Sequence, residues 1–360
     1  MTLGIFTDDY FPYIGGMGRY LHEVTRRLPQ HKFAVFSPCV NQLPGHTQVT
    51  PFLHDHLRNV SYSIWLQRNL DRFIDRCNLD RINIQCGPGG LFLFNRAKLP
   101  VIAICYHTWW QQSHYIRAQF WKKIFIPFEI LTYRRSDRII CISEDSRNIL
   151  VDKYRINASK TVVINPGVDT QYFYPLEDVE KIPNSLLYVG RVDKRKGVDF
   201  LIKAMPHAVR QKPDIKLFVG GVGKHLTALK AFVRSNGIEK NVNFLGFIPD
   251  ETLNLWYNKV QCVVIPSVFE GFGLTAVEAM AAGTSVICTE VDSLKHIVID
   301  GQSGFIVPYN DTATLGAKIV ALLSDPHLQQ RFSVKGRQRV QSLYNWDVVV
   351  GELAKELFDS

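Results

Sequence analysis

Short apolar segments alternate with amphipathic segments along almost the whole chain. Segments such as 3–7, 101–105 and 262–265 are four or five residues long and almost wholly apolar, which is typical of strands that are buried on both faces. A turn and then a helical pattern follow most of them. This order predicts an α/β fold built from doubly wound, Rossmann-like parallel sheets.

The length of 360 residues suggests two domains of this kind. The other segments predicted as strands are 33–37, 81–86, 138–143, 186–189, 216–219, 242–245, 285–288 and 304–307. A long helix is predicted over 60–78 and another over the last residues, 346–358.

One stretch, 266–283, combines a glycine-rich turn with the start of a predicted helix. Gly271 and Gly273 allow the backbone to turn sharply or a ligand to approach it closely. The amides of Phe272, Gly273 and Leu274 are then expected at the helix N-terminus. Unpaired N–H groups and the helix dipole favour an anion at such a place, so this stretch predicts a phosphate site.

Two carboxylates bracket these amides, Glu270 in the loop and Glu278 one turn into the helix. A phosphate at the amides, with a polyol reaching both carboxylates, would account for the whole stretch. The alternative is structural. Thr275 and Glu278 have the spacing of a capping box, in which Glu278 only satisfies a backbone donor, and Glu270 would be a loop carboxylate near the helix dipole.

Two cations follow the predicted strand at 186–189. Arg191 ends the strand turn and Lys196 lies just before the next helix, a placement that suits a diphosphate. The alternative is a solvated charged loop. The nearby sequence GGVGKHL is not a P-loop, because Phe218 and His225 occupy positions that a P-loop reserves for Gly and for Ser or Thr.

The first predicted strand leads into the turn Gly15-Gly16-x-Gly18, which opens an amphipathic helix. Strand, glycine turn and helix form the phosphate-cradling arrangement of doubly wound folds, although a simple tight turn would look the same. The nicotinamide fingerprint is not met, because Leu21 stands where its last glycine belongs. Asp8 and Asp9 are adjacent, so their side chains diverge in extended backbone, which argues against a metal site.

His107 lies just past the predicted strand 101–105. Ligands bind at the carboxyl ends of strands in open α/β sheets, and a histidine there can donate to a sugar hydroxyl or stabilise developing charge. The alternative is a surface or hydrogen-bonding histidine.

The net charge of +9 is unevenly distributed. Residues 1–168 contain 21 Lys and Arg against 12 Asp and Glu, whereas residues 169–360 contain 21 of each kind. The excess predicts an anionic partner for the first domain, and no nucleic-acid-binding signature accompanies it. The seven cysteines are scattered and form no C-x-x-C. That favours reduced thiols and a cytosolic location.

The segment 114–138 is both aromatic and basic. Ile116, Phe120, Ile124 and Phe128 recur every fourth residue, and Pro127 is expected to kink or break the helix. A basic amphipathic helix with such aromatics can lie on an anionic membrane; an ordinary packing helix is the alternative. No leader and no spanning helix are expected, because no apolar run reaches the ~18–20 residues required.

The spacing E-x7-E around GFGL, followed by EAMAAGTSVI, resembles the signature of the retaining glycosyltransferases of family four. The resemblance implies the GT-B architecture, in which two Rossmann-like domains face each other across a cleft. Residues 1–168 would then bind the acceptor and 169–345 the nucleotide sugar. Residues 346–360 would form a terminal helix that crosses back to the first domain.

The resemblance also assigns roles to individual residues. Glu270 would hold the donor sugar and Glu278 the ribose, Arg191 and Lys196 would bind the phosphates, and His107 would lie near the donor sugar. The residues expected to act in catalysis are His107, Arg191, Lys196 and Glu270. The residues expected to bind the donor are Gly15, Gly16, Arg191, Lys196, Phe247 in the turn near the base, Glu270, Phe272, Gly273, Leu274, Thr275 and Glu278.

The predicted function is transfer of a hexosyl residue, with retention, from a UDP- or GDP-sugar to a glycan or lipid-linked acceptor. No metal or cofactor is expected. The alternatives are a nucleotide-sugar epimerase of the same fold and a non-catalytic nucleotide-sugar binder in glycan assembly. The expected location is the cytoplasm, with peripheral contact at the cytoplasmic face of an anionic membrane through the basic first domain.

Overall fold

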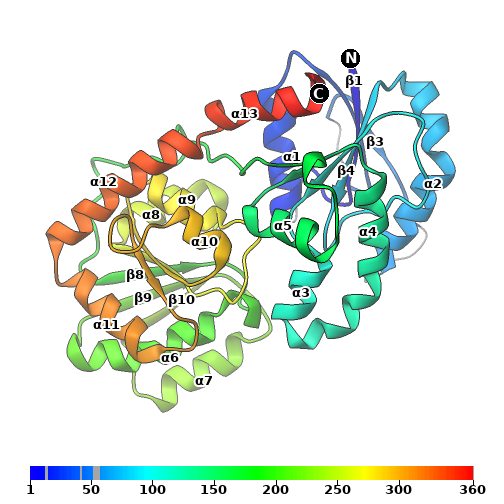
Figure 1. Cartoon of the computed structure of the whole chain (residues 1–360). Coiled ribbons are helices and arrows are strands. Elements are labelled where there is room, and N and C mark those ends of the chain that lie inside the picture. The colour runs from blue at the N-terminus through cyan, green and yellow to red at the C-terminus, as the bar shows by residue number, and fades with distance from the viewer. Residues whose placement is uncertain (13–14, 41–42, 52–56, 360) are drawn as a thin grey trace. The chain divides into compact units, whose positions relative to one another are not determined.

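The computed structural model describes residues 1–12, 15–40, 43–51 and 57–359. They form two compact units (Figure 1). Unit 1 comprises Met1–Pro166 and Val349–Ser360, and unit 2 comprises Gly167–Val348. Each unit is a parallel β-sheet with helices on its faces, as the alternation in the sequence predicts.

The sheet of unit 1 has the strand order β3-β2-β1-β4-β5-β6-β7. Its strands are β1 (Thr2–Phe6), β2 (Lys32–Ser37), β3 (His46–Gln48), β4 (Arg81–Cys86), β5 (Val101–Cys105), β6 (Arg138–Cys141) and β7 (Thr161–Val163). The order reverses between β1 and β4, which places the topological switch point of this unit there. The short edge strand β3 has no apolar pattern and was not predicted.

The helices of unit 1 include a tail from the C-terminus. They are α1 (Gly16–Arg27), α2 (Arg58–Cys77), α3 (Trp109–Tyr115), η2 (Arg117–Phe125), α4 (Ile126–Arg135), α5 (Glu144–Asn148), η3 (Ile149–Lys153), η4 (Ala158–Lys160), the end of α13 (Trp346–Ala354) and η6 (Lys355–Asp359). Arg138 binds Glu356 with two hydrogen bonds of 2.6 and 2.9 Å, and Phe358 stacks on His31 with ring centroids 3.7 Å apart. The tail is therefore an integral part of unit 1.

The sheet of unit 2 has the strand order β10-β9-β8-β11-β12-β13. Its strands are β8 (Ser185–Val189), β9 (Lys216–Gly220), β10 (Val242–Gly246), β11 (Cys262–Ile265), β12 (Ser285–Thr289) and β13 (Phe305–Val307). Its helices are η5 (Lys194–Lys196), α6 (Val198–Gln211), α7 (Leu226–Ser235), α8 (Asp250–Lys259), α9 (Leu274–Ala281), α10 (Asp292–Ile297), α11 (Thr312–Leu323), α12 (Pro326–Leu343) and the start of α13.

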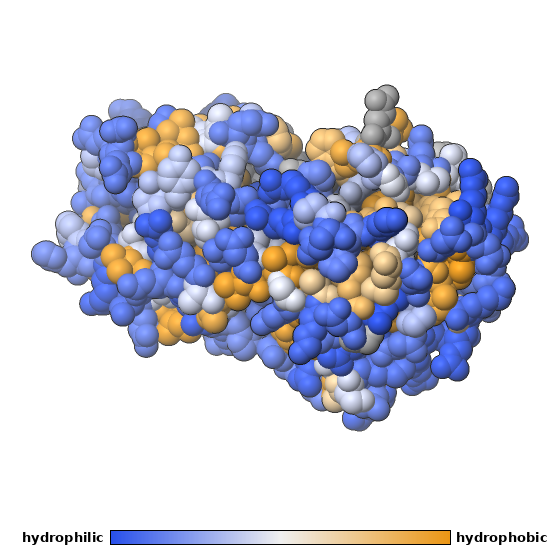
Figure 2. Space-filling view, turned by 90° about the horizontal axis from the view of Figure 1, so that it is seen from above, coloured by the Kyte–Doolittle hydropathy of each residue, from blue (hydrophilic) through white to orange (hydrophobic). Residues whose placement is uncertain are grey.

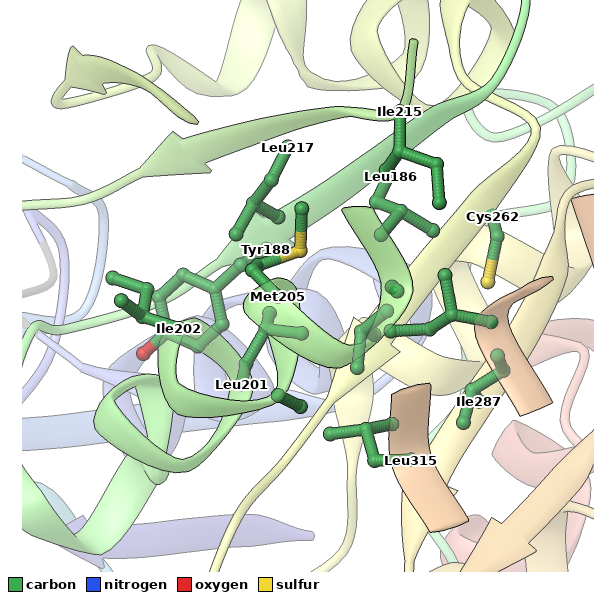
Figure 3. Packing of buried hydrophobic residues seen from close by; sticks show 14 of the residues in the cluster. Leu186, Tyr188, Leu201, Ile202, Met205, Ile215, Leu217, Cys262, Ile287 and Leu315 are labelled. Atoms are coloured by element: carbon green, nitrogen blue, oxygen red, sulfur yellow. The ribbon is translucent and has the colours of Figure 1, made fainter. Parts of the chain in front are cut away.

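The core of unit 2 lies between this sheet and helix α6, which packs in turn against α11 (Figure 1). In Figure 3, Leu186 and Leu217 from neighbouring strands lie close to Leu201 and Met205 of α6. All four side chains are fully buried. Hydrophobic burial thus fixes α6 against the strands whose ends carry the candidate site.

Figure 2 shows a face of the molecule on which polar and charged residues predominate and apolar residues are interspersed.

The aromatic segment 114–138 is broken next to Pro127, which is one of the two outcomes expected of that proline. It is divided into the end of α3, the 3₁₀ helix η2 and the α-helix α4. Pro127 lies in the first turn of α4, where its missing N–H leaves no intrahelical bond unmade. The proline therefore stands at the break, where α4 begins, and does not kink a continuous helix.

Candidate functional site

The candidate residues of unit 2 lie at its topological switch point. Strands β8 and β11 are neighbours in the sheet, although six helices and strands separate them in sequence. The turn after β8 carries Arg191 and Lys196, and the loop after β11 carries Glu270. Parallel strands end at the same edge of a sheet, so these two loops meet where doubly wound folds bind ligands.

Backbone contacts join the two loops directly. Asp193 caps η5 by accepting a 3.0 Å hydrogen bond from the amide of Lys196, and the amide of Val268 donates to the carbonyl of Arg195 at 2.9 Å. Gly197 has a φ of +65°, and a Cβ there would lie 1.8 Å from the carbonyl oxygen of Pro266. Only glycine fits this close approach, which sets the position of the Lys196 side chain.

An ion pair between buried Glu270 and partly buried Lys196 forms the centre of this arrangement. Lys196 Nζ donates to Glu270 Oε1 at 2.7 Å, and Ser267 Oγ donates to the same oxygen at 2.6 Å. Arg195 Nη1 lies 3.9 Å from Glu270 Oε2. Burial by itself would raise the pKa of Glu270, but the charges of Lys196 and Arg195 and the two hydrogen bonds hold that pKa below its ordinary value. Glu270 is therefore an ionised carboxylate at neutral pH.

Glu278 is the second carboxylate, and its partner contradicts the capping-box interpretation. Helix α9 begins at Leu274 with Gly273 as N-cap and no side-chain cap hydrogen bond, so Thr275 and Glu278 are not at capping-box positions. The buried carboxylate of Glu278 instead accepts a 2.9 Å hydrogen bond from the hydroxyl of Tyr257.

The start of α9 has the geometry that the glycines predict. Gly273 has a φ of +122°, and a Cβ there would come within 2.6 Å of Leu294. The helix begins at the next residue, Leu274, and the first amides of a helix have no intrahelical acceptor. Phe272 is buried, whereas Leu274 and Thr275 are half-buried. The amides of Leu274 and Thr275 are thus the first two of the helix, and they follow closely on the loop that carries Glu270.

Arg191 and Phe247 are oriented differently from the buried pair. The side chain of Arg191 is 70% exposed, with Nε 3.5 Å from Asp193 Oδ2, and Phe247 is 71% exposed in the turn after β10. Of the three cations in the KRK run, Arg195 and Lys196 are mostly buried. The structure therefore brings Lys196 and Glu270 together and leaves Arg191 and Phe247 at the surface of unit 2.

Four residues around this site were missed from the sequence. Arg195, Asp193 and Ser267 hold the two loops, and Tyr257 holds Glu278. Arg195 and Asp193 lie inside the motif that contains Arg191 and Lys196, so the motif itself was the signal. Tyr257 lies 21 residues before Glu278 and gives no local signal.

The glycines of the GGVGKHL segment have a packing role. A Cβ on Gly221 would lie 1.8 Å from the carbonyl oxygen of Gly190, and one on Gly223 would lie 2.3 Å from that of Val192. The loop after β9 thus packs directly against the turn after β8.

In unit 1, a carboxylate holds the turn of Gly15 and Gly16. Helix α1 begins at Gly16 with Gly15 as N-cap. Asp9 Oδ2 accepts hydrogen bonds from the amides of Gly15 at 3.0 Å and Gly18 at 3.1 Å. This contact uses the preference of a helix N-terminus for negative charge. Asp8 is engaged separately, by Arg58 Nε at 2.8 Å.

His107 follows β5, as predicted, and lies in a turn that several contacts fix. Its Nε2 is 3.3 Å from Gln112 Oε1. The next residue, Thr108, forms a capping box with Gln111 at the start of α3. The amide of Trp109 donates to buried Glu129 at 3.0 Å. These contacts give the His107 turn a defined position at the carboxyl edge of the sheet of unit 1.

Among the described residues, no three His, Cys, Asp or Glu side chains are grouped so that they could hold a metal ion. The same residues contain no helix that is long and apolar enough to cross a bilayer.

Family models match both halves of the chain. The model described as "Glycosyl transferases group 1" matches residues 177–339, and the model described as "Glycosyltransferase Family 4" matches residues 14–172. Together the two matches span most of the sequence. The chain belongs to the family-four type of glycosyltransferases, and its two parallel-sheet units have the GT-B fold.

Individual relatives agree with this assignment. The glycogen synthase of Mycobacterium tuberculosis is 30% identical over 223 residues, which are 62% of this chain and 54% of that enzyme; the chain thus spans about half the length of that relative. The sucrose-phosphate synthase structure from Thermosynechococcus elongatus has a TM-score of 0.82 at 21% identity, covering 100% of this chain and 99% of the other. Anabaena HepE in complex with UDP-glucose has a TM-score of 0.78 at 16% identity, covering 100% of both chains. At these identities the two structures establish the fold alone.

Proposed function

We propose that this chain transfers a hexosyl residue from a UDP- or GDP-sugar to a glycan or lipid-linked acceptor with retention of anomeric configuration and without a metal. The observation that carries the proposal is the ion pair between Lys196 and Glu270. It combines a cation for a diphosphate with an ionised carboxylate for sugar hydroxyls. The structural relative that was solved with UDP-glucose supports a nucleotide-sugar donor.

Stabilising the leaving diphosphate is the main chemical task of such a transfer. Lys196, Arg191 and the amides at the start of α9 would supply positive potential that is already in place before the reaction. Glu270 would bind hydroxyls of the donor sugar, and Glu278 would bind the ribose. Phe247, which is exposed beyond β10, would contact the base.

Retention requires no nucleophile from the protein in this proposal. The acceptor hydroxyl attacks the anomeric carbon on the face from which the diphosphate departs, and the departing phosphate oxygen takes the hydroxyl proton. His107 would donate to the donor sugar from unit 1, and the turn of Gly15 and Gly16 would face the diphosphate. The family resemblance assigns these roles, and the place of both turns after strands of a doubly wound sheet is compatible with them.

The basic unit 1 would bind the acceptor. Its excess positive charge suits an anionic or lipid-linked acceptor at the cytoplasmic face of a membrane. The protein would work in the cytoplasm, with peripheral membrane contact.

The test is to incubate the protein with UDP- and GDP-sugars and a panel of glycan and lipid-linked acceptors, and to follow the products by NMR. Release of nucleoside diphosphate together with a product of retained anomeric configuration is the expected result. An isomerised nucleotide sugar would identify an epimerase. An unchanged donor that nevertheless protects the protein against thermal unfolding would identify a non-catalytic binder. Either of these two outcomes would overturn the proposal.

A further inference from the structure

Unit 1 exposes four large apolar side chains within nine residues of sequence. Phe120 is 62% exposed, Trp121 53%, Ile124 65% and Phe128 42%. We call these four residues the aromatic patch. They lie on η2 and in the first turns of α4. In a 3₁₀ helix, residues three apart lie on the same side, so Trp121 and Ile124 form one row of the patch.

A small cluster of its own anchors the patch from below. Phe125 is only 7% exposed and packs with Trp109 and Phe92, its ring 4.8 Å from that of Trp109. Trp121 contacts the same Phe125 ring edge-on, with centroids 6.1 Å apart. The exposed side chains are thus held by a buried layer. Phe125 therefore belongs to the core, whereas Trp121 and Phe128 lie at the surface.

Positive charge accompanies the patch. Lys123 Nζ lies 4.1 Å from the ring centroid of Phe120, and Lys122 Nζ lies 5.8 Å from that of Trp121. Residues 117–128 contain no Asp or Glu. Aromatic side chains beside lysines match the chemistry of an interface between acidic headgroups and acyl chains.

We propose that the aromatic patch docks unit 1 on the surface of a bilayer that contains acidic phospholipid. Trp121, Ile124 and Phe128 enter the headgroup region, while Lys122 and Lys123 remain with the phosphates. Docking would bring unit 1 to a lipid-linked acceptor, and in this respect the proposal rests on the proposed function. Trp109, which packs beneath the patch, is two residues from His107, so docking places the His107 turn close to a lipid-linked acceptor.

Vesicle cosedimentation tests the proposal independently of catalysis. Wild type is expected to bind vesicles of mixed acidic and neutral phospholipid, to bind neutral vesicles weakly and to be released by high salt. The variant Trp121→Ser/Ile124→Ser/Phe128→Ser is expected to bind at least tenfold more weakly. Lys122→Gln and Lys123→Gln should each weaken binding by about fivefold. In the wild type, entry of Trp121 into the headgroup region should shift the tryptophan fluorescence to shorter wavelength when vesicles are added. Trp121→Phe should still bind vesicles but should not show this shift.

The matched control is Val334→Ser/Leu343→Ser/Val348→Ser, which removes three apolar side chains of 41–47% exposure from unit 2. It is expected to bind vesicles like wild type. Far-UV circular dichroism and nucleotide-sugar hydrolysis should be unchanged in both triple variants. Equal vesicle binding by the patch variant and wild type, or no binding of wild type to acidic vesicles at low salt, would overturn the docking proposal. Absence of sugar transfer by the wild type with every donor and acceptor of the panel would instead overturn the proposed function.

Discussion

At the scale of single residues, the ion pair of Lys196 and Glu270 explains how a buried charge is retained in unit 2. A buried carboxylate is costly unless it is paired and hydrogen-bonded. Glu270 has Lys196, Arg195 and Ser267 around it. In the proposed function a ligand diphosphate would compete with Glu270 for Lys196, and the pair would keep the cation in position until the donor binds.

Lys196→Ala is expected to weaken the binding of free UDP or GDP by about 2–3 kcal/mol, because one charge-assisted contact is lost. Arg191→Ala should weaken it by less, since that side chain is already solvated. Isothermal calorimetry measures both effects. Lys194→Ala, which removes an exposed lysine of the same turn, is the control and should bind like wild type. Wild-type affinity in Lys196→Ala would rule out the phosphate role.

Substitution of the two glutamates is expected to affect different measurements, turnover for Glu270 and nucleotide affinity for Glu278. Glu270→Gln should lower turnover by roughly 100-fold or more, about 2.7 kcal/mol in the barrier, with little change in UDP or GDP affinity. Glu278→Gln should lower nucleotide affinity, because the ribose is part of every ligand, and should melt near the wild-type temperature, because an amide oxygen can still accept from Tyr257. Normal nucleotide affinity in Glu278→Gln would contradict the ribose assignment.

At the scale of elements, the site depends on loops that touch through their backbones. The sequence predicted most strands because a buried parallel strand is an apolar run. It predicted the glycine turns because glycine allows a sharp turn or a close backbone approach. It could not predict the 3₁₀ geometry of η2, since the spacing of Phe120, Ile124 and Phe128 fits an α-helix equally well. The contacts of Tyr257 with Glu278 and of Asp9 with Gly15 join positions whose proximity only the folded chain defines.

Gly197→Ala tests the contact between the two loops of unit 2. Gly237 provides a matched control, because its φ of +64° is nearly the same as the +65° of Gly197 while a Cβ there would meet nothing within 4 Å. Gly237→Ala should cost about 1 kcal/mol of unfolding free energy from backbone strain alone. Gly197→Ala should cost about 1–3 kcal/mol more, because its Cβ meets Pro266. Equal losses of unfolding free energy in the two variants, measured by chemical denaturation, would show that the close contact between Gly197 and Pro266 does not stabilise unit 2.

Glu129 is expected to make the stability of unit 1 depend on pH. Burial raises the pKa of this carboxyl from 4.5 to about 8, against the opposing hydrogen bonds from Tyr154 and the amide of Trp109. Between about pH 4.5 and pH 8, the carboxyl of Glu129 is therefore protonated in the folded protein and ionised in the unfolded chain. The stabilisation is complete below pH 4.5 and is lost as the pH rises through about 8.

Replacement of Glu129 by Gln should remove this loss, which amounts to up to about 4 kcal/mol in wild type. Urea titrations between pH 5 and 9 measure it. Glu144→Gln, at a carboxylate that is 48% exposed, is the control and should keep the wild-type profile. A wild-type profile in Glu129→Gln would show that this carboxyl is ionised in the folded protein.

At the scale of the whole molecule, two parallel-sheet units form one GT-B glycosyltransferase chain. The fold class follows from the alternation of strands and helices, and the roles of Glu270 and Glu278 follow only from family resemblance. What the sequence could not supply is the network that holds each role in place, such as Arg195 beside Glu270. Such contacts arise from pairing β8 with β11, which are far apart in the chain.

The measurement that tests the central claim most directly is thermal protection by UDP-, GDP- and ADP-sugars in the presence of EDTA. A ligand present at 100 times its dissociation constant stabilises the folded state by about 2.7 kcal/mol. The account predicts a clear rise in Tm with a UDP- or GDP-sugar without any metal. No shift with any nucleotide sugar, or a shift that appears only after magnesium or manganese is restored, would contradict it.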